Sequence, residues 1–404
     1  MRGPLRGCRV IELAHIMAGP VCGLMLADMG ADVVKVEKPD GDDTRRFIPP
    51  DIRGESAAFM MMNRNKRGIT LDLKSAEGKE VLRRLLKSAD VVIENYRQGT
   101  MEKLGFGYEE LRKENPGLIY AEISGFGRTG PYSGRGGFDL IAQGMAGLMS
   151  ITGEGPGRQP VKVGAPVSDI TAGILGAMGI AAAYAHKLKT GEGQKVDTSL
   201  FEAAIVHTYW QSAIAFATGE APGPMGSAHP LNAPYQAFKA SDGWINIGAA
   251  NQTNWEKLVR LIDAEYLRDD ERFLTNRDRI INRLELAEEL NELLSKRSSA
   301  DWLALFEKDG LPAGPVLTVT EMHADPQTIA RDMVPTVSHP VAGNVQTIGA
   351  PVKFSKTPGG VNSAAPTLGQ HTTEILNELN YNEDEIQNIL LGCEKHPNEV
   401  KGSG

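Results

Sequence analysis

Short segments rich in Val and Ile recur through the first third of the chain, and the stretches between them carry helical spacing of apolar residues. The segments are residues 9–13, 31–37, 90–94 and 118–123. Strands that alternate with helices are joined by crossover connections, which bring successive strands into a sheet in parallel. The pattern therefore predicts a doubly wound α/β sheet.

The amino-acid composition changes after residue 169. Residues 170–186 are mostly Ala, Gly, Ile, Leu and Met, which favours a helix packed closely against other backbone rather than exposed to solvent. A strand is expected at 194–198. Ser199 then has the character of a helix cap, and the helix it starts is expected to run to about Phe216.

A Pro- and Gly-rich stretch at 221–230 is the best candidate for a linker. A hairpin pattern follows it, and a charged stretch with helical period comes next. Further strand and helix signals occupy the last 75 residues. We therefore expect an N-terminal part of a large domain at 1–220, a smaller α/β domain at 225–325, and a C-terminal segment at 330–400 that returns to the large domain.

Charge and cysteine content exclude several classes of protein. The net charge is −8 and no basic domain stands out, so nucleic acid is not an expected partner. Three cysteines in no ligand spacing suit a reducing compartment. The N-terminus lacks a signal-peptide pattern, and no apolar run of 18 residues is evident, so no membrane association is expected. We expect a cytoplasmic protein, or one of the mitochondrial matrix if a presequence was removed.

One glycine motif invites a dinucleotide-binding interpretation. Residues 125–130 read GFGRTG and follow a predicted strand. The next residues, rich in Gly and including Pro131, cannot form the helix that would hold a pyrophosphate. Residues 125–137 are therefore either a flexible surface loop or a mobile loop over an active site.

Basic residues gather near the ends of the first strands, where open α/β sheets collect ligands. They are Lys35, Lys38, Arg45, Arg46, Arg64, Lys66, Arg67 and Lys74. They are either solvated surface charges or partners for a phosphate-rich ligand. His15 lies just after the first strand, but no His pair has metal-ligand spacing, so no metal site is expected.

Asp169 is a lone carboxylate that enters the helix of small residues. By spacing alone it is either an ordinary N-cap or a nucleophile toward a thioester carbonyl. The spacing does not decide between the two.

These stretches, taken in order, resemble the class III (CaiB/BaiF-type) CoA-transferases, in the branch that acts on dicarboxylates. The matching stretches are ELAHIMAGP at 12–20, GADVVKVE at 30–37, NRNKR at 63–67, LDLK at 71–74, ENYR at 94–97, GFGRTGP at 125–131, the segment through Asp169, KTGEG at 189–193, PYQAF at 234–238 and LGQH at 368–371. They span nearly the whole chain, so the resemblance does not rest on one motif.

The resemblance implies a Rossmann-like large domain made from both chain ends, a smaller domain between them, and two subunits interlocked as rings. It implies that Asp169 is the nucleophile and forms an aspartyl-CoA thioester. The residues expected to bind CoA are Lys38, Leu71, Lys74, Asn95, Tyr96, Arg97 and Lys103. The substrates would be an acyl-CoA and a carboxylic acid, with no permanently bound cofactor and no metal.

The same resemblance favours succinyl-CoA as donor and a dicarboxylate or substituted succinate as acceptor. Arg46, Arg64 or Arg135 is expected to hold the distal carboxylate. Met17 and the segment 248–252 depart from some members of the family. Two alternatives stay open: an α-methylacyl-CoA racemase, which Phe138 disfavours because it replaces a catalytic His, and a non-catalytic CoA-binding subunit of a heteromer rather than a homodimer.

Overall fold

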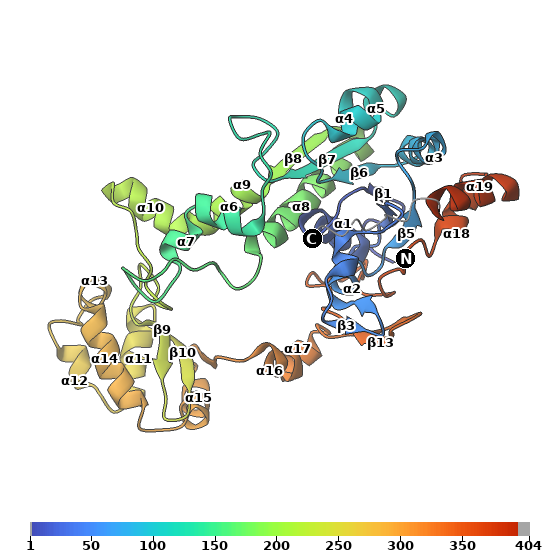
Figure 1. The fold of residues 1–404 in the computed structure, drawn as a ribbon. Coiled ribbons are helices and arrows are strands. Elements are labelled where there is room, and N and C mark those ends of the chain that lie inside the picture. Colours follow the sequence, from blue (N-terminus) through green and yellow to red (C-terminus); the bar gives the residue numbers. More distant parts are fainter. Residues whose placement is uncertain (1, 395–404) are drawn as a thin grey trace, which may run out of the picture. The chain divides into compact units, whose positions relative to one another are not determined.

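The computed structural model describes residues 2–394, and its fold divides into two units (Figure 1). The first unit is built from the chain up to Ala146, from Gly164–His207 and from Asp325 onwards. The second unit comprises Gly147–Val163 and Thr208–Ala324. The predicted limits 1–220, 225–325 and 330–400 stay a prediction, and the last residues of the third segment, 395–400, lie outside the described part of the chain.

Six parallel strands form the sheet of the first unit, in the order β5-β2-β1-β6-β7-β8. They are β1 (Arg9–Glu12), β2 (Asp32–Glu37), β5 (Arg67–Thr70), β6 (Val91–Glu94), β7 (Ile119–Ser124) and β8 (Lys195–Ser199). Val10 fixes the register at the centre, since it pairs with Val33 on one side and Val91 on the other. The order reverses between β1 and β6, as in a Rossmann sheet. The predicted α/β architecture is confirmed; β5 was not predicted.

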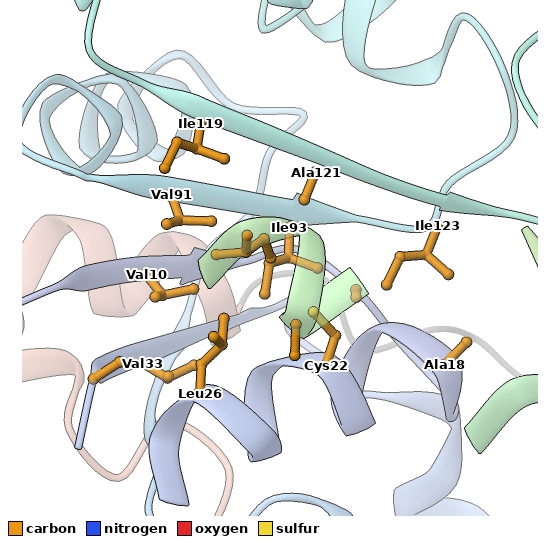
Figure 2. Packing of buried hydrophobic residues seen from close by; sticks show 14 of the residues in the cluster. Val10, Ala18, Cys22, Leu26, Val33, Val91, Ile93, Ile119, Ala121 and Ile123 are labelled. Carbon is orange, nitrogen blue, oxygen red and sulfur yellow. The ribbon is translucent and has the colours of Figure 1, made fainter. Parts of the chain in front are cut away.

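Helices cover both faces of this sheet. One face packs against α1 (Ala18–Asp28) and α8 (Val167–Thr190); Figure 2 shows Val10, Val33 and Ile93 of the strands directed at Cys22 and Leu26 of α1. The other face packs against α3 (Ala76–Lys87), α4 (Thr100–Leu104), α5 (Tyr108–Glu114), α18 (Thr372–Glu378) and α19 (Glu383–Glu394). The sheet of the first unit therefore lies between two hydrophobic clusters, one on each face.

Helix α8 has glycines where it meets α1. A Cβ on Gly173 would lie 2.7 Å from the Ala18 carbonyl oxygen, so only glycine permits this approach. The opposite side of α8 exposes Ile174 and Met178, contrary to the expectation that the helix is covered. By length and mean hydropathy alone α8 would suffice to cross a membrane, but it packs against α1 in the core of the first unit.

The chain after Ser199 is not one long helix. Ser199 caps α9 (Leu200–Ile205) as predicted, accepting a hydrogen bond from the Glu202 backbone N–H at 3.2 Å. A 3₁₀ turn, Val206–Thr208, then interrupts the helix before α10 (Tyr209–Thr218). The division between the two units falls at this turn.

The second unit contains the predicted hairpin, β9 (Tyr235–Lys239) and β10 (Trp244–Gly248), with β11 (Ala313–Pro315) added at one edge. The helices of this unit are α7 (Leu148–Ile151), α10, α11 (Gln252–Leu261), α12 (Tyr266–Asp269), α13 (Asn276–Ile281), α14 (Arg283–Leu294), α15 (Ser299–Lys308) and α16 (Val319–Ala324). Its core is built around Trp255, Phe273 and Phe306, so it has a hydrophobic centre of its own.

The last part of the chain packs on the N-terminal strands. The backbone N–H of His371 donates to the Gly68 carbonyl of β5 at 2.9 Å, and the N–H of Gly360 donates to the Asp28 carbonyl at 2.8 Å. The β-structure of this last part is a two-stranded sheet of β12 (Thr336–His339) and β13 (Gly343–Gln346). Smaller elements of the first unit are Asp43–Arg46 (3₁₀), β3 (Asp51–Ile52), β4 (Glu55–Ser56), α2 (Ala57–Met62), α6 (Asp139–Met145) and α17 (Pro326–Ala330).

Candidate active site

Two loops meet where the strand order reverses. The loop after β1 carries His15, and the loop after β6 carries Asn95. The Asn95 side chain accepts a hydrogen bond from the His15 backbone N–H at 3.0 Å and donates one to the His15 carbonyl at 2.8 Å. Ligands of open α/β sheets bind at this position, because the loops on either side of the reversal diverge and leave a crevice.

A cavity of about 430 Å³ occupies this crevice. Its walls come from the ends of β1, β6 and β7, from the glycine-rich segment before α6 and from the first turn of α8. The lining includes His15, Met17, Asn95, Tyr96, Arg97, Arg128, Arg135 and Asp169. The structure thus brings four residues of the predicted site, Asn95, Tyr96, Arg97 and Asp169, to one cavity.

Asp169 is the third residue of α8, and the N-cap position belongs to Pro166, so Asp169 is not a cap. Within the described residues, no group donates a hydrogen bond to its carboxylate. Burial and, second, the nearby charge of Asp139 raise the pKa of Asp169 to about 7. A carboxylate without partners at the wall of a cavity is available to attack a ligand.

Asp139 links the first turns of α6 and α8. One of its carboxylate oxygens accepts a hydrogen bond from the Ser168 backbone N–H at 2.9 Å, and the other accepts one from the Gln143 side chain at 2.7 Å. The contact with Ser168 fixes the residue next to Asp169. Asp139 therefore both orients the start of α8 and supplies a like charge to Asp169.

The segment 125–137 forms a loop with its two ends in contact. A Cβ on Gly125 would lie 2.8 Å from the Gly137 Cα, so glycine is required where the ends cross. Gly125 and residues 133–137 line the cavity with Asp169. Of the two interpretations left open, a surface loop or a loop over the active site, the geometry favours the second. Since α6 begins only at Asp139, no helix follows the GFGRTG motif as dinucleotide binding requires.

Arg128 connects this loop to the turn after β6. Its guanidinium forms ion pairs with Glu94 at 2.5 Å and Glu122 at 3.2 Å, and it donates to the Tyr96 carbonyl at 3.0 Å. Burial raises the pKa of Glu94 to about 7 although Arg128 opposes this shift. Arg128 thereby holds the Tyr96 backbone at the cavity wall.

The remaining predicted CoA-binding residues are spread more widely. Lys38 lines a second, smaller cavity of about 170 Å³, which shares His15 and Tyr96 with the first. Lys74 and Lys103 are exposed and line neither cavity. Leu71 is fully buried in the core next to β5, and its backbone N–H donates to the Glu37 carbonyl at 2.8 Å, so no part of it faces either cavity.

Most of the basic cluster is structural. Arg64 is buried and forms a two-pronged ion pair with Asp28, with distances of 2.6 and 3.2 Å, so the prediction that it holds a substrate carboxylate is wrong. Lys35 and Lys66 are buried against Glu12. Arg45 pairs with Glu37, and Arg67 pairs with Asp32, Glu374 and Glu378. Arg46 is exposed and pairs with Asp43 and Asp40, whereas Arg135 lies at the cavity, 4.1 Å above the Tyr132 ring.

Sequence reasoning missed Asp139 and Arg128 as parts of the site. The contacts that tie them to the site, Asp139 with Ser168 and Arg128 with Glu94, join residues 29 and 34 positions apart, so no local pattern marks these contacts. The available signal was positional: Asp139 directly follows the glycine-rich segment, and Arg128 is the one charged residue in GFGRTG.

Known proteins give an independent comparison. The model of CoA-transferase family III matches residues 5–372. The chain is 41% identical over 383 residues to the succinate–glutarate CoA-transferase of Agrobacterium fabrum, covering 93% of this chain and 96% of that protein. It is 40% identical over 388 residues to the succinyl-CoA:mesaconate CoA-transferase of Haloarcula marismortui, again covering 93% of this chain and 96% of the relative.

A solved structure gives the same family and a similar fold. The crystal structure of a CaiB/BaiF family protein from Brucella suis superposes with a TM-score of 0.84 at 42% sequence identity. The superposition covers 94% of this chain and 100% of that chain.

Proposed function

Because the chain belongs to CoA-transferase family III, and is therefore an enzyme that transfers coenzyme A, we propose that Asp169 carries CoA covalently from succinyl-CoA to another dicarboxylic acid. The observation that carries the proposal is the unpartnered Asp169 carboxylate in the cavity at the sheet's reversal point. The choice of acids follows the two relatives, which act on succinate with glutarate and on succinyl-CoA with mesaconate according to their names.

The proposed reaction exchanges activated carboxyl groups in four steps. The Asp169 carboxylate attacks the thioester carbonyl of succinyl-CoA, and the C–S bond breaks to give a mixed anhydride and CoA thiolate. The thiolate attacks the Asp169 carbonyl and expels succinate, leaving an aspartyl-CoA thioester. The acceptor carboxylate then attacks this thioester and releases the thiolate, which takes the acceptor acyl group from the second anhydride. No proton or electron is gained or lost, so no bound cofactor is needed.

The cavity offers groups for each part of the substrates. Tyr96, Arg97 and Lys38 would meet CoA along the two adjoining cavities, with Asn95, Lys74 and Lys103 as further contacts. Backbone N–H groups of the 125–137 loop would stabilise the oxyanions. Arg135 is placed to pair with the distal carboxylate of a dicarboxylic acid, and Arg46 is a second candidate.

A panel assay tests the function directly. Purified protein is incubated with succinyl-CoA and each of a series of mono- and dicarboxylic acids, and the CoA esters are separated by chromatography. Transfer to at least one dicarboxylate is expected. Turnover of a 2-methylacyl-CoA without acceptor acid would instead identify a racemase. CoA binding without turnover until a related chain is added would identify a heteromer subunit.

The rate should depend on pH through Asp169. Because the nucleophile is the ionised carboxylate and its pKa lies near 7, kcat/KM is expected to fall about tenfold per pH unit below 7 and to level off above it. Asp139→Asn removes the neighbouring charge, so the falling limb should move to lower pH. The ionisation of CoA itself is the same in both assays, so it cannot produce a difference between wild type and variant. Superimposable profiles would contradict the role given to Asp139.

CoA affinity should depend on the exposed lysines. Lys38→Gln, Lys74→Gln and Lys103→Gln each remove a charge that would face a phosphate, so KM for acyl-CoA is expected to rise roughly 3- to 30-fold with little change in kcat. Added salt should weaken CoA binding in the wild type. Lys113→Gln, on the exposed side of α5, is the matched control. An unchanged KM in all three variants would show that CoA lies elsewhere.

We also propose that two chains interlock. Helix α6 exposes the apolar side chains of Leu140, Ile141 and Met145, and α8 exposes those of Ile174 and Met178, which a second subunit could cover. Because the first turns of the same two helices carry Asp139 and Asp169, a second subunit there would cover the site. Light scattering should give twice the chain mass even on strong dilution, and a compact monomer would contradict the proposal.

The proposed compartment is the cytoplasm, or the mitochondrial matrix if a presequence was removed. Cys8 and Cys22 are buried free thiols, which suits a reducing environment. Cell fractionation with an antibody to the chain is the direct measurement, and recovery in an oxidising compartment would contradict it.

A further inference from the structure

The backbone turns sharply at Ile16, at the wall of the cavity. Its φ is +68°, a left-handed conformation that is unfavourable for a β-branched residue because Cβ crowds the carbonyl oxygen. The other non-glycine residues with positive φ in the described chain are Asn, Asp and Arg residues. Ile16 is thus an outlier by residue type and lies beside the proposed active site.

Hydrogen bonds on three consecutive residues hold this turn. The Ala14 carbonyl accepts one from the Lys35 ammonium at 2.9 Å, and Asn95 bonds both backbone groups of His15. The Ile16 N–H itself donates to the Asp42 carboxylate at 3.2 Å. A conformation that the residue type disfavours persists only where its surroundings enforce it.

Asp42 is rigidly held. It is 4% exposed, and the oxygen that faces Ile16 also accepts hydrogen bonds from the Thr44 N–H at 2.9 Å and the Thr44 hydroxyl at 2.8 Å. Its other oxygen pairs with Lys35 at 2.9 Å. Asp42 therefore has a fixed position from which to hold the Ile16 N–H.

The turn decides where α1 begins. Met17 is the N-cap of α1 and supplies no side-chain cap, and Met17 and Ala18 line the cavity that contains Asp169. A Cβ on Gly19 would lie 2.1 Å from the Ala14 Cβ, so the first turn of α1 is pressed onto the strand end. If Ile16 relaxed to negative φ, the amino end of α1 would leave this position.

We propose that Asp42 is a positioning residue: it enforces the left-handed turn at Ile16 and thereby sets the uncapped amino end of α1 against the cavity in which Asp169 reacts. This rests on the proposed function of Asp169. Asp42 does not touch the reacting atoms. Its effect on turnover passes through the backbone of Ile16.

A double-mutant cycle tests the proposal, because glycine adopts positive φ without penalty. Asp42→Ala is expected to lower kcat at saturating acyl-CoA by roughly tenfold in the parent enzyme. In an enzyme that already carries Ile16→Gly, the same change should lower kcat less than threefold, since glycine keeps the turn unaided. A purely structural Asp42 would lower the thermal midpoint and leave kcat, per folded molecule, unchanged; that result, or equal losses in both backgrounds, overturns the proposal.

Thr44→Val supports the test if Asp42→Ala folds poorly. It removes only the hydroxyl that orients Asp42, so a smaller loss of kcat is expected, again suppressed by Ile16→Gly. Crystal structures give a readout independent of activity. Ile16 should have negative φ in the Asp42→Ala protein, and residue 16 should keep positive φ in the Asp42→Ala, Ile16→Gly protein. Positive φ at Ile16 without Asp42 would overturn the inference even if CoA transfer is established, whereas absence of transfer by the wild type would overturn the proposed function instead.

Discussion

Asp169→Asn is expected to lower kcat for CoA transfer by at least about 10³-fold while CoA still binds. Asparagine keeps the size and shape of the side chain but is not an anionic nucleophile. The Asp169 carboxylate has no hydrogen-bond partner within residues 2–394, so the change should disturb little else. Steady-state kinetics and calorimetric CoA binding measure the two effects separately.

The covalent intermediate gives a second measurement. Wild-type protein incubated with acyl-CoA should carry a CoA adduct on the peptide that contains Asp169, removable by hydroxylamine and visible by mass spectrometry. The matched control is Glu77→Gln, which changes another acid in the first turn of a helix, α3, outside the cavity. Near-normal turnover by Asp169→Asn, with no adduct on the wild type, would remove the proposed mechanism.

Glu12→Gln should lower the free energy of unfolding by about 3–5 kcal/mol. Glu12 is fully buried and pairs with the ammonium groups of Lys35 at 3.1 Å and Lys66 at 2.8 Å. A Cβ on Gly23 would lie 1.9 Å from a Glu12 carboxylate oxygen, so helix α1 is packed tightly against this oxygen. The substitution removes the carboxylate that both buried cations share and leaves Lys66 with two uncharged hydrogen-bond partners, Asn63 and the Pro20 carbonyl.

The loss of unfolding free energy caused by Glu12→Gln should become smaller as pH rises. Burial already lowers the pKa of Lys66 to about 8, although Glu12 opposes this shift, so without Glu12 the lysine should fold in its neutral form. In the unfolded chain Lys66 stays protonated up to about pH 10.4, so folding of the variant must release this proton. The free-energy cost of that release falls as pH rises. Urea unfolding at pH 6 and pH 9 measures the difference. Glu80→Gln, which breaks an exposed pair with Arg84, should cost under about 1 kcal/mol, and an equal effect of both substitutions would contradict the prediction.

The sequence predicted the centre of the sheet well because β1, β2, β6 and β7 are buried on both faces. Residues 31–37 and 118–123 form β2 and β7, and both are rich in Val, Ile or Leu although charged residues interrupt them. The edge strand β5 was missed, since its four residues, RGIT, carry a charge and a glycine. Arg67 is accommodated there because Asp32 and Glu378 surround its guanidinium. Neither partner is near Arg67 in the sequence.

The site was predictable only in part, for a similar reason. Asp169 and the turn at 95–97 were found through the resemblance to a family, whereas spacing left Asp169 undecided between cap and nucleophile. Lys35 and Lys38 are the same residue type three positions apart, but Lys35 is buried among carboxylates and Lys38 is exposed. Burial separates structural from functional charges, and it arises only when distant segments pack.

The hydrogen bonds between His371 and Gly68 join residues 303 positions apart, which sets an order of events during synthesis. At about 5–20 residues per second, roughly 15–60 s pass on the ribosome between the appearance of one partner and the other. During that interval the outer edge of β5 lacks the segment that later covers it. An exposed edge of a sheet readily pairs with another chain, so the nascent protein is most vulnerable to aggregation before the segment with His371 emerges.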